Sequence, residues 1–264
     1  MYFWALIAFT FTACASAKKS VNNDAVSEIV LNGKIWSSLY QQQAAEYKAL
    51  CYQAYNIAKH RLDEAVAIKS KKPLAIITDI DETVLDNSPY AVHNALQGKD
   101  YEAGTWYTWT SKANAIPIAG SQEFFNYAAS KGVTVFYITN REEKERAATL
   151  ENLKKYNYPF SQSKHLILRQ SVSSKEERRQ TVSEKYDIVL MLGDNLSDFS
   201  VLWDKKSVAE RNKNVDDNAA LFGKKFIMFP NINYGGWEDA IFGNQHNLTP
   251  AQKDSAIKAN LKSY

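Results

Sequence analysis

The sequence LAIITDIDET, residues 74–83, joins a short apolar run to a cluster of acidic residues. The run LAII does not alternate between apolar and polar positions, which is typical of a strand buried on both faces of a parallel sheet. Asp79 and Asp81 follow almost at once. This stretch therefore predicts a parallel sheet that presents two carboxylates where one of its strands ends.

Four further apolar runs follow along the chain, and we expect each of them to form a strand. They are VTVFYIT (133–139), HLILR (165–169), DIVLMLGD (187–194) and KFIMFP (225–230). Stretches with helical character separate these runs, at 121–132, about 142–156 and about 173–185. Because strands and helices alternate in this way, the sequence predicts an α/β domain with a doubly wound, mostly parallel five-stranded sheet.

The intervals between these elements indicate how the chain is organised. The α/β core is expected to span residues 73–264. The interval between its first two strands is too long for one crossover helix, so we predict a small cap insertion at about 86–118. That insertion includes the aromatic cluster YEAGTWYTWT, residues 101–110. Upstream, residues 33–72 are predicted to be helical, because apolar residues recur there mostly at spacings of three and four.

Composition and charge narrow the class of protein. The chain has 264 residues, of which 45% are hydrophobic and 23% charged, as in an ordinary globular protein rather than a disordered or collagen-like one. Lysine and arginine exceed aspartate and glutamate only slightly, by 32 to 29, which argues against a nucleic acid polymer as partner. The four histidines are scattered, without the HxH or HExxH spacing that predicts a zinc site.

The first 17 residues carry no charge, and their apolar stretch is too short to span a bilayer, which takes ~20 residues. We interpret residues 1–13 as a signal peptide for export. The next residue, Cys14, resembles the lipidated cysteine of bacterial lipoproteins, so residues 14–32 would form a lipidated N-terminus and a tether. This predicts a protein of the bacterial cell envelope, attached to the outer membrane through its lipid. The alternative is a plain signal peptide and a periplasmic protein, because Phe11 replaces the usual Leu and no basic residue precedes the apolar stretch.

Acidic residues gather where two of the predicted strands end. Asp79 and Asp81 follow the first strand, and Asp194 and Asp198 follow the fourth. The carboxyl ends of parallel strands meet at one edge of a sheet, where the ligands of open α/β proteins bind. Neighbouring carboxylates repel each other unless a cation lies between them or one of them is protonated. The four aspartates therefore predict an oxygen-only cation site that suits Mg²⁺.

Two other strand ends bring polar side chains to the same edge. Thr139 and Asn140 follow the second strand, and Lys175 lies at the beginning of the helix after the third. Each of these motifs alone is more often a solvated turn or helix surface than a functional site. Their occurrence together, in this order, predicts one active site at the carboxyl edge of the sheet.

The segments AIITDIDETVLDNSPY, VFYITNR and LGDNLSDF resemble the motifs of the class C acid phosphatases, which carry a four-aspartate signature within the haloacid dehalogenase (HAD) superfamily of phosphohydrolases. The segments EYKALCYQAYNIAK and FPNINYGGWE, with the Trp-rich insertion, are similar to the bacterial outer-membrane lipoprotein acid phosphatases, also described as 5′-nucleotidases. The resemblance covers about residues 36–242. It implies an HAD-like fold and Mg²⁺-dependent hydrolysis of phosphomonoesters, in particular nucleoside monophosphates, through an aspartyl phosphate.

The resemblance also implies a role for each matching catalytic residue. Asp79 would be the nucleophile that attacks phosphorus. Asp81 would be the general acid that protonates the leaving alkoxide and then the base that activates water. Lys175 would neutralise charge on the nucleophile and on the phosphoryl group, and Thr139 would hold a phosphoryl oxygen, with Asn140 beside it.

Metal and substrate contacts follow from the same resemblance. Mg²⁺ is expected on the side chains of Asp79 and Asp194 and on the backbone carbonyl of Asp81, with Asp198 completing or orienting the shell. The side chain of Asp81 must stay free of the metal, because otherwise it could not carry a proton. Tyr234 is a candidate for stacking on the substrate. The residues Trp106 and Trp109 are candidates as well, but packing within the cap explains them equally.

Two alternative functions are also compatible with these sequence features. A non-catalytic surface lipoprotein that binds haem or a small ligand would also use an aromatic-rich pocket. Its weakness is that all six residues of the predicted catalytic set are present, and that no CxxCH haem site exists. A phosphotransferase would differ only in passing the phosphoryl group to an alcohol instead of water. The oligomeric state is left open by the sequence, and a homodimer is one prediction to test.

Overall fold

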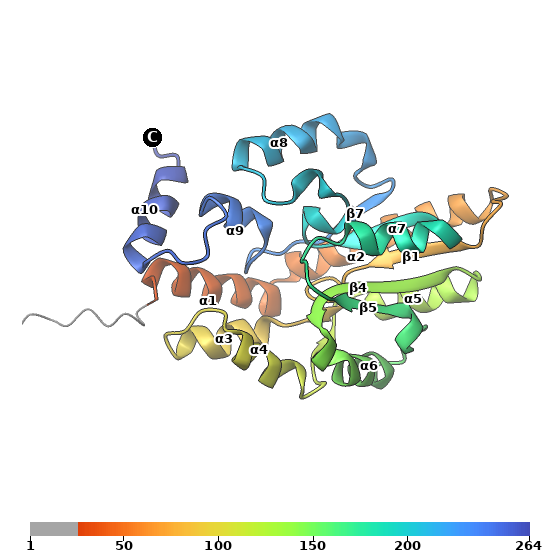
Figure 1. Cartoon of the computed structure of the whole chain (residues 1–264), viewed down its shortest axis with the longest axis horizontal. Helices are drawn as coiled ribbons and strands as arrows, with labels where there is room; N and C mark the ends of the chain where they lie inside the picture. Colours follow the sequence, from red (N-terminus) through yellow and green to blue (C-terminus); the bar gives the residue numbers. More distant parts are fainter. Residues whose placement is uncertain (1–25) are drawn as a thin grey trace, which may run out of the picture.

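The computed structural model describes residues 26–264, drawn in colour in Figure 1. The predicted signal peptide, Cys14 and most of the predicted tether lie outside the described residues. Among residues 26–264, no helix is both long enough and apolar enough to cross a membrane.

A five-stranded sheet forms the centre of the molecule, and all of its strand pairs are parallel. Its strands are β1 (Leu74–Thr78), β4 (Thr134–Glu142), β5 (Leu166–Arg169), β6 (Asp187–Gly193) and β7 (Phe226–Met228). They lie in the order β5-β4-β1-β6-β7, so β1 is central and has β4 and β6 as its neighbours. The predicted doubly wound α/β fold is confirmed, and the carboxyl ends of β1, β4 and β6 come together.

Both faces of the sheet are covered by helices, which explains why its strands are apolar without alternation. Side chains such as Ile76 and Tyr137 pack on one face against α2 (Ala45–Val66) and α5 (Ser121–Ser130), and α6 (Arg146–Lys155) completes this layer. On the other face, Ile77 and Phe136 pack against Val182 of α7. This second layer contains α7 (Glu176–Lys185) and α8 (Val208–Asp217).

The N-terminal helical segment differs from the prediction at both ends. Helix α1 (Glu28–Gln43) begins within the predicted tether of residues 14–32. At the beginning of α1, the side chain of Ser27 accepts a hydrogen bond from the Val30 amide. This is a capping interaction, which the spacing of apolar residues does not reveal. The chain is extended at Ala44, which separates α1 from α2, and α2 ends at Val66, before the lysine-rich stretch that precedes β1.

Residues 86–118, where we predicted an insertion, contain α3 (Ser88–Leu96) and α4 (Ala103–Thr110). Their ends are joined by a short antiparallel ribbon of β2 (Leu85–Asp86) and β3 (Ile116–Pro117). Helix α3 packs on α1, and the C-terminal helices α9 (Gly236–Ile241) and α10 (Pro250–Asn260) lie on the other side of α1 in Figure 1. Residues of the insertion line one pocket with Asp79 and Asp194, which follow β1 and β6, so the insertion lies beside the carboxyl edge of the sheet.

Candidate active site

The chain leaves the sheet directly after β1. The amide of Asp79 still donates to the carbonyl of Leu192 on β6, at 3.0 Å, so Asp79 is held in register with the sheet. The carbonyl of Ile80 then accepts the amides of Val84 and Leu85, which closes a tight turn. Within this turn Glu82 adopts a positive φ of 59°. The turn places Asp79 and Asp81 at the base of a pocket on the carboxyl edge of the sheet.

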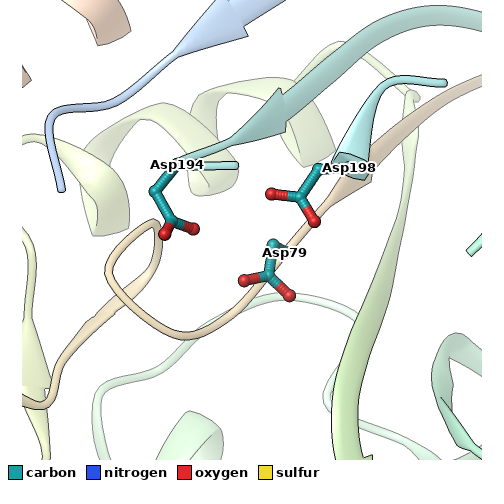
Figure 2. A group of neighbouring side chains, drawn as sticks. All are labelled: Asp79, Asp194 and Asp198. Atoms are coloured by element: carbon teal, nitrogen blue, oxygen red, sulfur yellow. The ribbon is translucent and has the colours of Figure 1, made fainter. Parts of the chain in front are cut away.

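Three carboxylates converge at the base of this pocket (Figure 2). Asp79 follows β1, Asp194 follows β6, and Asp198 ends the short turn Leu196–Asp198. One oxygen from each lies within 4.8 Å of the other two, and all three side chains are largely buried. The amide of Asn195 donates to Oδ2 of Asp198 at 3.0 Å, which fixes the position of that carboxylate.

Lys175 lies among these carboxylates. Its Nζ forms ion pairs with Oδ1 of Asp79 and, at 2.7 Å, with Oδ1 of Asp198. When ionised, the three carboxylates carry three negative charges, and the ammonium of Lys175 compensates one of them. A divalent cation would compensate the remaining two. The donor set is made of oxygen atoms, as Mg²⁺ and Ca²⁺ prefer. The residues present therefore fit a hard divalent cation.

The pKa values of two carboxylates in the cluster are raised, as expected for a site with excess negative charge. Burial raises the pKa of Asp79 to about 7, against the opposing effect of Lys175 and with the support of nearby Asp198 and Asp81. Burial also raises the pKa of Asp194, and the charges of Asp198 and Asp79 add to this effect. Without a cation, the carboxylates thus resist full ionisation at this site.

The carboxylate of Asp194 is held by two side chains that the sequence analysis did not identify. Oδ1 accepts a hydrogen bond from Oγ1 of Thr83 at 3.1 Å, and Oδ2 accepts one from Nδ2 of Asn231 at 2.8 Å. Thr83 belongs to the turn after β1, and Asn231 follows β7. Asn231 could have been found, because it is a polar residue that follows a predicted strand on the edge where the site was expected.

The side chain of Asp81 binds elsewhere in the pocket and is not part of the three-carboxylate cluster. It forms a bidentate ion pair with Arg141, whose Nη2 lies 2.7 Å from Oδ1 and whose Nε lies 3.2 Å from Oδ2. Asn87 donates to Oδ1 at 2.9 Å, and Thr139 donates to Oδ2 at 3.4 Å. The side chain of Asp81 therefore lies outside the three-carboxylate cluster, whereas contact of its backbone carbonyl with a metal stays a prediction. Arg141 was missed, although it directly follows the predicted Thr139 and Asn140.

The predicted substrate contacts occupy different positions in the pocket. Thr139 is fully buried beside Asp81, whereas Asn140 is exposed at the rim, where its Oδ1 accepts from Nη2 of Arg178 at 2.7 Å.

Tyr234 lines the pocket, and its hydroxyl donates to Oε2 of Glu82. Burial, with the nearby charge of Asp81, raises the pKa of Glu82 to about 8.

The pocket above the carboxylates has a volume of about 510 Å³. Aromatic residues of the insertion line one wall, and Trp106 is among them, with Tyr90 and Tyr101. Trp109 instead packs against the main hydrophobic core. The two tryptophans that the sequence left ambiguous therefore have different environments.

A family model described as HAD superfamily, subfamily IIIB (acid phosphatase), matches residues 7–237. The chain belongs to this family. Its fold is similar to that of the class C acid phosphatase from Bacillus anthracis, with 43% sequence identity, a TM-score of 0.86, and coverage of 89% of this chain and 99% of that one. A second structure of that enzyme, with tungstate bound, gives 42% identity, a TM-score of 0.87, and coverage of 90% and 99%.

Two curated plant relatives align with part of the chain. Acid phosphatase 1 of Solanum lycopersicum is 32% identical over 130 residues, which are 46% of this chain and 50% of the relative. Vegetative storage protein 2 of Arabidopsis thaliana is 26% identical over 172 residues, or 62% and 61%. The chain thus spans between half and three fifths of the length of these curated relatives.

As a member of subfamily IIIB, the chain is a four-aspartate HAD protein, which confirms the family predicted from its motifs. The structure brings one carboxylate oxygen each of Asp79, Asp194 and Asp198 within 4.8 Å of one another, and Lys175 forms ion pairs with Asp79 and Asp198. It places Asp81 and Thr139 side by side, apart from that cluster.

Proposed function

We propose that this protein is a Mg²⁺-dependent acid phosphatase that hydrolyses phosphomonoesters, with nucleoside monophosphates as its preferred substrates. The observation that carries the proposal is the pairing of Asp79 with Lys175 at the base of an open pocket that Asp81 also lines. A nucleophile, a cation that can neutralise a phosphoryl group, and a separate acid are the parts that phosphate-ester hydrolysis through a covalent intermediate needs.

In the first step, a carboxylate oxygen of Asp79 attacks phosphorus, and the bond to the ester oxygen breaks. Asp81 donates its proton to that oxygen, so the alcohol leaves neutral. Lys175 stabilises the negative charge that the phosphoryl oxygens carry in the transition state, and the hydroxyl of Thr139 would hold one of those oxygens. In the second step, water attacks the aspartyl phosphate, Asp81 accepts the water's proton, and phosphate leaves.

The metal in this proposal is Mg²⁺. Asp79, Asp194 and Asp198 would hold it through carboxylate oxygens, and Asp81 through its backbone carbonyl. When bound, it would supply positive charge that neutralises the phosphoryl group and screens the repulsion between nucleophile and substrate. The choice of Mg²⁺ is supported by the oxygen-only donor set, by two uncompensated negative charges, and by the phosphate that the substrate itself contributes as a ligand.

The preference for nucleotides rests on the pocket. Its volume of about 510 Å³ is within the usual range for sites that take a whole small molecule rather than a phosphate alone. Trp106 and Tyr234 present aromatic rings to this space, and Tyr234 is anchored through its hydroxyl. A flat base can stack on such rings, whereas a small alkyl phosphate would leave them unused.

One assay tests this function. Phosphate release is measured from a panel of nucleoside monophosphates, aryl phosphates and small alkyl phosphates, with Mg²⁺ and with a chelator. We expect hydrolysis only in the presence of metal, with the highest kcat/KM for a nucleoside monophosphate. Failure to hydrolyse any of the esters with Mg²⁺ present would overturn the proposed activity. Hydrolysis of all of them with equal kcat/KM would overturn the nucleotide preference alone.

Attachment to the outer membrane through a lipid on Cys14 belongs to the same proposal, since an envelope enzyme could release nucleosides from nucleotides that cannot cross the membrane. It is supported by the uncharged N-terminal segment and by the small residues before Cys14. A homodimer stays a prediction, which light scattering of the purified protein would test.

A further inference from the structure

The two oxygens of the Asp81 carboxylate have different surroundings. Oδ1 accepts three hydrogen bonds, from Nη2 of Arg141 at 2.7 Å, Nε of Arg141 at 3.1 Å and Nδ2 of Asn87 at 2.9 Å. Oδ2 has only longer contacts, with Nε of Arg141 at 3.2 Å and Oγ1 of Thr139 at 3.4 Å. Oδ1 therefore accepts more and shorter hydrogen bonds than Oδ2, which makes Oδ2 the oxygen that can take up a proton at the lower cost in broken contacts.

Trp109 on helix α4 orients Asn87 together with the carbonyl of Leu85, which accepts a longer hydrogen bond from Nδ2 of Asn87 at 3.4 Å. The indole Nε1 of Trp109 lies 2.8 Å from Oδ1 of Asn87. An indole N–H can only donate, so it selects the amide orientation in which Oδ1 faces Trp109 and the NH₂ group faces Asp81. Asn87 itself is 2% exposed, which leaves little room for water to replace this contact.

Arg141 is also in contact with helix α4. Its guanidinium carbon lies 5.8 Å from the centre of the Trp106 ring, within the range of a cation–π interaction. Its Nη1 donates to Oγ1 of Thr149 at 3.1 Å, and the residue is 2% exposed. Trp106 and Trp109 are three residues apart and thus share one side of the helix. Helix α4 therefore contacts both residues that bind Oδ1 of Asp81, Asn87 and Arg141.

We infer that helix α4 positions the general acid: Trp109 acts through Asn87 and Trp106 through Arg141 to fix Oδ1 of Asp81, so that Oδ2 is the oxygen that exchanges the proton. This inference rests on the proposed function, in which Asp81 is the acid and base. The proton on Oδ2 passes to the ester oxygen as the P–O bond breaks, and Oδ2 accepts a proton from water in the second step. Asn87 and Trp109 are positioning residues, since they act only through Asp81.

The decisive variant is Trp109→Phe, which removes the indole N–H and keeps most of the apolar packing. An alkyl leaving group needs the proton of the acid, whereas p-nitrophenolate is stable without it. We therefore expect kcat/KM to fall by about tenfold or more for a nucleoside monophosphate and to change little for p-nitrophenyl phosphate. Asn87→Ser, which removes the donor to Asp81 and keeps the Trp109 side chain, should have the same selective effect.

Trp203→Phe is the matched control, because the indole of Trp203 also donates a hydrogen bond, to the carbonyl of Arg211 at 3.2 Å, but lies in a core cluster outside the pocket. It should affect both esters equally. In an Asp81→Asn background, Trp109→Phe should cause no further selective loss. Equal losses for the two esters in Trp109→Phe, or an undiminished selective loss in the Asp81→Asn background, would overturn the inference.

A structural readout separates this inference from the proposed function. If the wild-type protein hydrolyses neither ester, the proposed function is wrong, whereas the positioning can still be examined in crystals of Trp109→Phe. We expect the Asn87 amide to rotate and Asp81 to lose the contact of Oδ1 with Nδ2. An unchanged Asn87–Asp81 hydrogen bond in that crystal structure would contradict the role of Trp109.

Discussion

Gly193 and Asp198 lie so close together that the side chain of Asp198 occupies the space a β-carbon at Gly193 would need. A β-carbon built on Gly193 would come within 2.5 Å of the β-carbon of Asp198. Gly193 is the last residue of β6, and its backbone carbonyl accepts the amide of Phe229 next to β7. Because this hydrogen bond ties β6 to the chain after β7, β6 cannot easily move away from Asp198. Asp198 can turn back toward Asp79 and Lys175 because Gly193 has no side chain.

We accordingly expect Gly193→Ala to displace Asp198 and to weaken divalent cation binding by roughly ten- to a hundredfold, as the loss of a supporting contact in a metal site does. Isothermal titration calorimetry with Mg²⁺ would measure this. Gly33→Ala is the matched control, because nothing lies within 4 Å of a β-carbon there and the position is inside helix α1. It should leave Mg²⁺ binding unchanged and raise the free energy of unfolding by about 0.5–1 kcal/mol.

The proposed nucleophile and acid make separable predictions. Asp79→Asn should reduce kcat by on the order of a thousandfold or more for every ester, because an amide cannot attack phosphorus. Asp81→Asn should cost roughly 10²–10⁴-fold with alkyl esters and less with p-nitrophenyl phosphate. Asp217→Asn, at an exposed helical position, is the control. Activity near that of the wild type in purified Asp79→Asn would rule out the covalent mechanism.

Asp194→Asn removes one negative charge from the cation site while Thr83 and Asn231 remain in place. The apparent Mg²⁺ requirement should rise by about tenfold or more, and chelation should inactivate the wild type reversibly. Titration of activity against free Mg²⁺ provides the measurement. Full activity in exhaustively chelated wild-type protein would show that the carboxylate cluster does not serve a metal.

His165 should make the fold sensitive to acid. Its ring lies between Phe136 and Phe160, with ring centroids at 5.3 Å and 4.9 Å, and burial lowers its pKa below the ordinary 6.5, with a smaller effect from Lys164. As the pH falls through 6.5, the unfolded chain binds a proton that the folded protein does not, so stability decreases until the pH passes the lower, folded-state pKa.

Denaturant unfolding between about pH 5 and pH 8 would show this decrease, and His165→Gln should make it smaller. The same substitution at an exposed histidine, His93→Gln, provides the comparison for the effect of His165→Gln. A profile that His165→Gln leaves unchanged would mean that another group causes the acid sensitivity.

The predicted anchor can be tested apart from the enzyme. With acyl chains on Cys14, wild-type protein should enter the detergent phase on phase partitioning, since each buried CH₂ contributes ~0.8 kcal/mol. Cys14→Ser should stay in the aqueous phase or remain unprocessed, and keep its phosphatase activity. Mass spectrometry of the N-terminal peptide identifies the modification. Wild-type protein in the aqueous phase with an unmodified N-terminus would indicate a plain secretory signal.

Short-range patterns in the sequence were enough to determine the sheet and the location of the site. A strand buried on both faces is apolar almost throughout, so the runs that form β1, β4 and β6 were visible without any knowledge of their neighbours. Parallel strands end on one edge, so polar residues that follow them, such as Asp79 and Asp194, had to meet there. The beginning of α1 at Glu28 was missed because Ser27, a capping residue, lies outside the apolar pattern that guided the prediction.

Only the tertiary structure decided which side chains pair within the site. Arg141 is 60 residues from Asp81 in sequence, and Asn231 is 37 residues from Asp194. Such pairs depend on how loops from different strands and the insertion fold over the sheet edge. Local periodicity reports the burial of a segment, but a hydrogen bond needs two atoms at about 3 Å and a suitable angle. That geometry arises only once the strands, the turn after β1 and helix α4 are packed together.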